Sequence, residues 1–143
     1  MNERVQKAFA LREESYNCAQ AVIAPLAEAL NITEEAAMGF AGALGGGMRV
    51  GEVCGAAAGA ALAIGLRYGQ IYPNDIAAKG QCGLVMGQFM AEFERRMGSL
   101  RCEDLLGGKL HDPATAAVAE GNKKIVCPQA IQTALEILEE MGF

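Results

Sequence analysis

The sequence predicts an all-α protein, a compact bundle of about six to eight helices that residues 1–143 form as a single domain. Three observations support this fold class. Apolar residues recur at helical spacing in nearly every long segment. Val, Ile and Thr, which favour strands, total only 18 residues. Ala accounts for 26 and Gly for 18 of the 143 residues, a composition typical of closely packed helices.

The first three helices have recognisable starts and ends. Helical spacing predicts a first helix over Glu3–Arg12. We expect a second helix to begin after Ser15 as its N-cap and to kink or break at Pro25, which lacks a backbone N–H. Thr33 is the expected N-cap of a third helix, which ends before the glycines 45–47.

The next two helices contain most of the predicted core. One begins near Gly51–Glu52 and runs through Cys54 to Leu66, and we place it at the centre of the bundle because its small residues allow close approach. The other follows Pro73 with Asn74 as its N-cap. Its predicted core stripe consists of Cys82, Val85, Met86, Phe89, Met90, Phe93 and Met97, and Gly80, Gly83 and Gly87 form a second, close-packing face.

Three shorter elements complete the prediction. Ser99 starts a short helix that includes Cys102 and stops at Gly107–Gly108. Asp112–Pro113 has the pattern of an N-cap followed by Pro at the first helical position, and it opens a segment that ends at Gly121–Asn122. The last helix is expected to start at Cys127–Pro128.

Charge and hydropathy exclude several functions. A net charge of −5 does not suit nucleic-acid binding, which requires a positive surface. The longest uncharged apolar run, 53–66, is too short to span a membrane. Charged residues throughout the first 14 positions do not fit a secretory signal, so we expect a cytoplasmic protein. The glycine-faced helices suit packing within one chain or across a homodimer, and no feature identifies a redox partner protein.

Five cysteines are present although a core of this size does not need covalent or metal crosslinks. Four of them fall at predicted helix starts, where unpaired N–H groups and the helix dipole stabilise a thiolate: Cys18, Cys54, Cys102 and Cys127. Cys82 falls mid-helix in the core stripe and is interpreted as packing. If the four helix starts converge, they form a site for metal ligation or disulfide exchange.

The cysteine spacing rules out local motifs. The chain contains no C-x-x-C, so the signatures of zinc ribbons, thioredoxins and ferredoxins are absent, and without C-x-x-C-H there is no covalent c-type haem. Any shared site must therefore be assembled by tertiary folding, and spacing does not show which cysteines meet.

Several segments together carry a family resemblance: residues 16–21 (YNCAQA), residues 45–59 (GGGMRVGEVCGAAAG), Cys102 and Cys127–Pro128. In these segments the chain resembles the C_GCAxxG_C_C family, whose members are regarded as redox-active. The resemblance covers essentially the whole chain and implies four characteristic cysteines that match Cys18, Cys54, Cys102 and Cys127. It also implies redox activity or a prosthetic group such as an iron–sulfur cluster.

The glycine-rich segment 42–51 lies before the second of these cysteines. It lacks the G-x-x-x-x-G-K-[ST] pattern and follows a helix, which argues against nucleotide binding. We expect its glycines to let the backbone pass close to Cys54 and its ligand, with Gly47, Arg49, Gly51 and Glu52 as cofactor-binding residues. Arg49 would supply positive charge to a thiolate. A plain surface turn is the alternative, and His111 is interpreted as an exposed loop residue.

The leading hypothesis is a redox protein that holds an iron–sulfur cluster or another metal through the thiolates of Cys18, Cys54, Cys102 and Cys127. It would act as an oxidoreductase or an electron-transfer accessory. The first alternative is thiol–disulfide chemistry, in which a low-pKa thiolate attacks and a partner cysteine resolves the mixed disulfide. The second is a helical interaction protein whose cysteines only pack. Serine hydrolase chemistry has no support, since neither G-x-S-x-G nor a second histidine is present.

Overall fold

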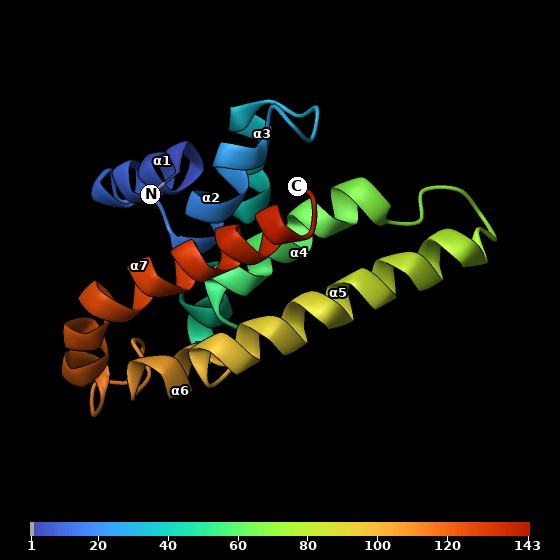
Figure 1. Ribbon diagram of the computed structural model, residues 1–143. Coiled ribbons are helices and arrows are strands. Elements are labelled where there is room, and N and C mark those ends of the chain that lie inside the picture. The colour runs from blue at the N-terminus through green and yellow to red at the C-terminus, as the bar shows by residue number, and fades with distance from the viewer. Residues whose placement is uncertain (1) are drawn as a thin grey trace.

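A computed structural model describes residues 2–143 and confirms the all-α class. No strand occurs in these residues, and their only β-type pairing is an isolated antiparallel bridge between Val53 and Arg101. The helices, shown in Figure 1, are α1 (Glu3–Glu13), α2 (Cys18–Ile23), the 3-10 turn η1 (Ala24–Leu26), α3 (Glu34–Ala41), the irregular turn η2 (Gly47–Gly51), α4 (Gly55–Tyr68), α5 (Ile76–Met97), α6 (Cys102–Leu106) and α7 (Ala116–Glu140).

Side-chain caps fix the starts of the N-terminal helices. Asn17, not Ser15, caps α2: its side chain accepts a hydrogen bond from the Gln20 N–H, and the Gln20 side chain accepts one from the Asn17 N–H. As predicted, the helix breaks near Pro25: α2 ends at Ile23, and Pro25 lies in η1. Thr33 caps α3 as predicted, since its hydroxyl accepts a hydrogen bond from the Ala36 N–H at 3.0 Å.

The central position predicted for α4 is confirmed, because α4 packs against α2, α3, α5 and α7. Two of its glycines allow the contact with α2. A Cβ on Gly59 would lie 2.6 Å from the Ala19 carbonyl oxygen, and a Cβ on Gly55 would lie 3.2 Å from the Cys18 Cβ. The helix begins later than expected, with Cys54 as its N-cap residue.

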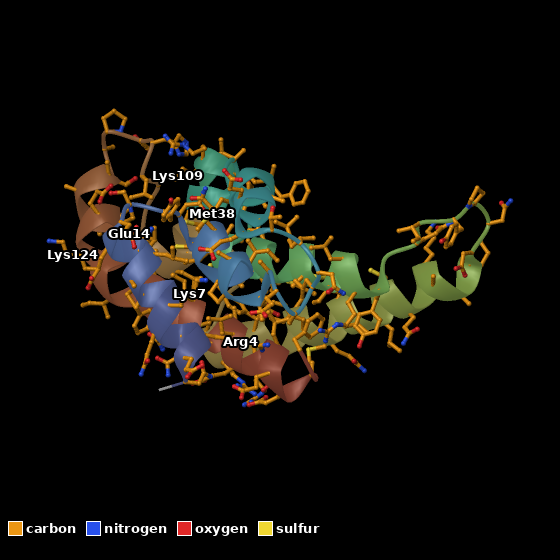
Figure 2. All side chains as sticks on the ribbon, turned by 90° about the horizontal axis from the view of Figure 1, so that it is seen from above. Arg4, Lys7, Glu14, Met38, Lys109 and Lys124 are labelled. Carbon is orange, nitrogen blue, oxygen red and sulfur yellow. The ribbon has the colours of Figure 1, made fainter. Side chains whose placement is uncertain are left out.

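The glycine face predicted for α5 is wrong as a packing surface. Gly80, Gly83 and Gly87 have open space where a Cβ would be, whereas the opposite stripe buries Phe89 and Phe93. The physical reason is position: the α4–α5 connection and the first turns of α5 project beyond the other helices in both views (Figures 1 and 2), so nothing covers this face within residues 2–143.

The C-terminal segment also differs from expectation. A single helix, α7, replaces the two predicted elements, and it passes through Gly121 and Pro128 without ending. Pro128 removes one intrahelical hydrogen bond, but buried side chains before and after it hold α7 against the core, among them Ala119 and Ile131. Asp112 forms a turn by accepting a hydrogen bond from the Ala114 N–H at 3.0 Å, and so does not cap a helix.

No helix within residues 2–143 combines the length and apolar character needed to cross a membrane.

Candidate functional site

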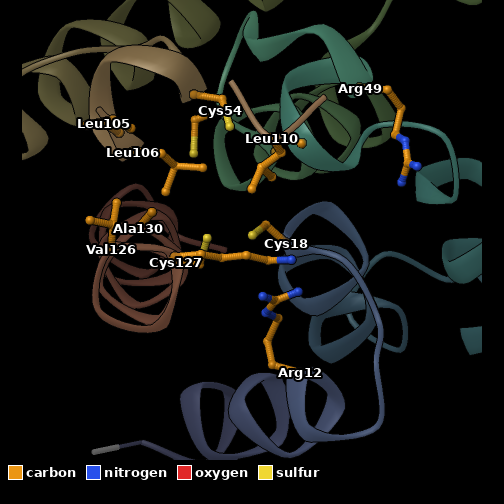
Figure 3. Close-up of a pocket in the computed structure, with 14 residues that line it drawn as sticks. Arg12, Cys18, Arg49, Cys54, Leu105, Leu106, Leu110, Val126, Cys127 and Ala130 are labelled. Atoms are coloured by element: carbon orange, nitrogen blue, oxygen red, sulfur yellow. The ribbon is translucent and has the colours of Figure 1, made fainter. Parts of the chain in front are cut away.

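All four cysteines predicted to share a site line one cavity of about 90 Å³: Cys18, Cys54, Cys102 and Cys127. Each is almost fully buried, with 6–9% of its surface exposed. Figure 3 shows the side chains of Cys18, Cys54 and Cys127 directed toward a common centre from α2, the start of α4 and α7. Cys82 does not line this cavity and packs, half-buried, against the core.

A short backbone pairing brings Cys54 and Cys102 together. The N–H of Cys54 donates to the Leu100 carbonyl at 2.7 Å, and the N–H of Cys102 donates to the Glu52 carbonyl at 2.6 Å. These two bonds flank the bridge between Val53 and Arg101. The two helix starts, of α4 and α6, are thereby held at one end of the bundle although 48 residues separate their cysteines in the sequence.

Cys18 and Cys127 are positioned by helices α2 and α7, and the position of Cys127 differs from the prediction. Cys18 is the first residue of α2, directly after the Asn17 cap. Cys127 does not begin a helix, as the sequence suggested, but lies in the interior of α7, where its own N–H is not a free helix-end group. Cys127 lies close to Cys18 in the cavity, and the interaction between the two thiols is the largest cause of the shift in both pKa values.

The hydrogen bond between the two thiols shifts their pKa values in opposite directions. It is the largest cause that lowers the pKa of Cys18 from 9.0 to about 7, against the opposing effect of burial, and the charges of Arg12 and Lys123 add to the lowering. The same hydrogen bond and burial raise the pKa of Cys127, which is therefore the donor. At neutral pH the pair consists of a partly ionised Cys18 and a protonated Cys127.

The other two thiols are protonated at neutral pH. Burial raises the pKa of Cys54 to about 12 and that of Cys102 to about 11, and the charge of Cys18 adds to both effects. The N–H groups of Ala56 and Ala57 at the start of α4 lower the pKa of Cys54, but less than burial raises it. Of the four cysteines, only Cys18 has the lowered pKa expected for a helix start.

The charged side chains that line the cavity are all cations: Arg12, Arg49 and Lys123. Arg12 extends from α1 toward Cys18 (Figure 3), and its guanidinium donates a hydrogen bond to the Tyr16 carbonyl at 2.8 Å. The sequence interpretation missed Arg12 and Lys123. A signal exists for Lys123, because it precedes Cys127 by four residues and so lies on the same face of α7.

The four loop residues predicted to bind a cofactor have separate positions. Arg49 lines the cavity, although it is not among the main causes of the Cys54 pKa. Gly47 lies against Cys102: a Cβ there would be 2.8 Å from the Cys102 Cβ and 2.5 Å from the Glu52 nitrogen.

The other two loop residues contact the segment around α6. Gly51, at φ 75°, packs against Glu103, and Glu52 forms an ion pair with Arg101 at 3.5 Å. His111 lies in an adjoining hollow of about 200 Å³ that Arg49 and Lys123 also line.

The arrangement does not form a ready metal-ligand set. Across residues 2–143, no three side chains of His, Cys, Asp or Glu come close enough together to hold a metal ion. Four thiols face one cavity, and among them Cys18 and Cys127 shift each other's pKa most strongly.

A comparison with protein-family models matches residues 16–141 to the family described as "Putative redox-active protein (C_GCAxxG_C_C)". The match covers most of the chain. The chain belongs to this family. The C_GCAxxG_C_C match includes the four cavity cysteines and the glycine-rich segment before Cys54, whereas Arg12 in α1 lies outside it. Membership supports redox activity as the class of function. Comparisons with curated proteins and with solved structures gave no match.

Proposed function

We propose that the protein is a thiol–disulfide redox protein in which Cys18 and Cys127 form a reversible disulfide. The observation that carries the proposal is that the buried side chains of Cys18 and Cys127 face the same small cavity (Figure 3), where the interaction with Cys127 lowers the pKa of Cys18 to about 7. A thiolate is the attacking species in disulfide exchange, and an attacking thiol works best when its pKa is near ambient pH.

The exchange takes two steps. The Cys18 thiolate attacks one sulfur of a substrate disulfide, forms a mixed disulfide, and releases the other half of the substrate as a thiolate. Cys127 then loses its proton to solvent and attacks the Cys18 sulfur, which releases the second half of the substrate as a thiolate. The two cysteines lose two electrons, and the substrate disulfide gains them.

Cys54 and Cys102 have a different part in this proposal. Their raised pKa values keep both thiols protonated at neutral pH, so they do not compete with Cys18 as nucleophiles. They line the cavity as uncharged side chains beside the reacting pair.

The direct test is to equilibrate the reduced protein with dithiothreitol redox buffers, block free thiols by alkylation, and map disulfides by mass spectrometry. We expect a reversible Cys18–Cys127 disulfide that is lost in Cys18→Ser and in Cys127→Ser. Cys82→Ser is the matched control and should leave it intact. A protein whose thiols neither oxidise nor alkylate in the native state would contradict the proposal and favour purely structural cysteines.

A second candidate is an iron–sulfur cluster or another thiolate-bound metal. The observation in its favour is that all four family cysteines line a single cavity free of carboxylates. The described side chains do not form a ready ligand set, so we derive no step through such a group. Anaerobic purification followed by iron and sulfide analysis and a visible absorption spectrum separates the candidates: bound iron with sulfide supports the cluster, and a colourless, metal-free protein supports the disulfide.

A further inference from the structure

The cysteine cavity has two chemically different sides. Three cations line it without any carboxylate, in a chain whose net charge is −5. The remaining wall is apolar and includes Leu105, Leu106 and Val126. A ligand that fits both sides has an anionic end and an apolar middle.

The three cations have few interactions within the protein and can therefore bind an anionic ligand. Within the described chain, Arg49 and Lys123 have no hydrogen bond or ion pair with another residue, and Arg12 has only a backbone carbonyl as partner. By contrast, Arg95, Arg96 and Arg101 each pair with a glutamate. No carboxylate in the cavity lining pairs with these cations.

Two of the cations act on the sulfur that the proposed function uses. Arg12 and Lys123 both lower the pKa of Cys18, so their charges lie within electrostatic reach of the point of attack. Lys123 also lines two outer hollows: one of about 480 Å³, which it shares with Arg12, Glu13 and Glu120, and one of about 200 Å³, which it shares with Arg49 and Glu120. Carboxylates therefore occur in the outer hollows, whereas the charged side chains of the cysteine cavity itself are all cations. A molecule in either hollow thus meets a cation that also faces the thiols.

Arg49 is held at the rim by an unusual backbone. Met48 and Arg49 have φ values of 57° and 69°, a left-handed conformation that side chains other than glycine rarely adopt. Residues kept in such conformations concentrate at ligand sites. This strain accompanies the cationic lining and supports the same inference.

We propose that the cationic side of this cavity selects small disulfides that carry carboxylate groups, an inference that rests on the thiol–disulfide function proposed above. The carboxylates meet Arg12, Arg49 and Lys123, while the sulfur atoms and their methylene groups lie against the apolar wall beside Cys18. Electrostatic attraction raises the encounter rate and orients the disulfide. The two-step exchange is otherwise unchanged.

The experiment compares three symmetric disulfides that differ in charge: dithiodipropionate (dianion), hydroxyethyl disulfide (neutral) and cystamine (dication). The second-order rate of Cys18–Cys127 oxidation is measured for each and divided by the rate of the same disulfide with a small free thiol, which removes differences in leaving group. We expect the normalised rate of the dianion to exceed that of the dication by about tenfold or more. The ratio should fall as salt is added.

Variants assign the selectivity to the cavity. Arg12→Gln and Lys123→Gln should each reduce the dianion-to-dication ratio severalfold. Lys79→Gln makes the same chemical change at an exposed side chain of α5 that lines neither the cysteine cavity nor the two outer hollows, and it should leave the ratio unchanged. The ratio is the readout because Arg12→Gln also raises the pKa of Cys18 and slows every disulfide.

Two outcomes would overturn the inference. Equal normalised rates for the three disulfides in the wild-type protein would refute charge selection while leaving the thiol–disulfide function standing. Oxidation by none of the three would refute that function and this inference with it. The salt dependence of the wild-type protein needs no variant and stays decisive if a substitution impairs folding.

Discussion

Replacing Cys127 by alanine removes the hydrogen bond that most lowers the pKa of Cys18. The pKa of Cys18 should then rise from about 7 toward 9.0, since burial continues to favour the neutral thiol while Arg12 and Lys123 still lower the pKa. A difference of about 2 in pKa corresponds to about 3 kcal/mol between the two protonation states. At pH 7 the ionised fraction of Cys18 would fall from about one half to about 1%, roughly a 50-fold loss of attacking thiolate.

Cys127→Ser provides a matched comparison. A serine hydroxyl still donates a hydrogen bond to the Cys18 sulfur but forms no disulfide. We expect Cys127→Ser to keep the Cys18 pKa within about one unit of the wild-type value, whereas Cys127→Ala raises it fully. Neither variant should form the intramolecular disulfide, so the two variants separate the hydrogen bond from the redox role.

The assay is a pH titration of thiolate absorbance in the ultraviolet, which does not require a reagent to enter the cavity. The Cys18 signal is obtained by subtracting the titration of Cys18→Ser in each background. An unchanged Cys18 midpoint in Cys127→Ala would refute the reasoning, because the low pKa would then come from the helix start or the nearby cations.

Three further predictions concern stability, measured as the free energy of unfolding in denaturant. Gly59→Ala should cost about 1–3 kcal/mol, because its Cβ would lie 2.6 Å from the Ala19 carbonyl, while Gly65→Ala in the same helix has open space and should stabilise by about 0.5–1 kcal/mol. Asn17→Ala should cost about 1–3 kcal/mol, because it removes the cap of α2 and the hydrogen bonds that the Asn17 side chain donates to the Ala41 and Gly42 carbonyls; circular dichroism should show an intact helical fold. Burial raises the pKa of Cys54 to about 12 in the folded protein. The contribution of the neutral Cys54 thiol to the free energy of unfolding is therefore fully present below pH 9, and it is lost between pH 9 and 12 at about 1.4 kcal/mol per pH unit. In Cys54→Ala the free energy of unfolding should decrease less steeply above pH 9 than in the wild-type protein, and an identical slope would contradict the raised pKa of Cys54.

Local chemistry explains what the sequence could predict. Thr33 signals a helix start because its hydroxyl satisfies a free N–H, and Gly59 signals close packing because only a residue without a side chain fits beside Ala19. The helix α2 stops just before Pro25, because proline has no backbone N–H to continue the helical hydrogen bonds. Each of these features depends on a few neighbouring residues, so it can be recognised without knowing the tertiary structure.

Features that depend on distant packing could not be predicted in the same way. Pro128 follows Cys127 in a pattern typical of a helix start, yet contacts with other helices stabilise one continuous α7. The glycines of α5, such as Gly83, have the spacing of a packing face, but the part of the helix that carries them projects beyond the bundle. The pairing of Cys18 with Cys127 joins the two ends of the chain, and no local pattern encodes it.

The acidities within the cavity also distinguish the two redox candidates. Three of the four thiols, Cys54, Cys102 and Cys127, have raised pKa values and are protonated at pH 7. A metal or cluster held by four thiolates requires all of these protons to leave, so its affinity should rise steeply with pH. Oxidation of the Cys18–Cys127 pair requires only one thiol of raised pKa, Cys127, to lose its proton, and it leaves Cys54 and Cys102 unchanged.

This difference gives a final prediction. In redox buffers between pH 6 and pH 8, the rate of Cys18–Cys127 oxidation should follow the ionisation of Cys18 with a midpoint near pH 7, and the Cys54→Ala/Cys102→Ala double variant should keep that profile. Iron or zinc uptake by four thiolates would instead be abolished by the double variant and would release protons that a pH indicator detects. Loss of oxidation in the double variant, with its fold intact by circular dichroism, would show that all four cysteines act as one unit and would contradict the assignment of the chemistry to the Cys18–Cys127 pair.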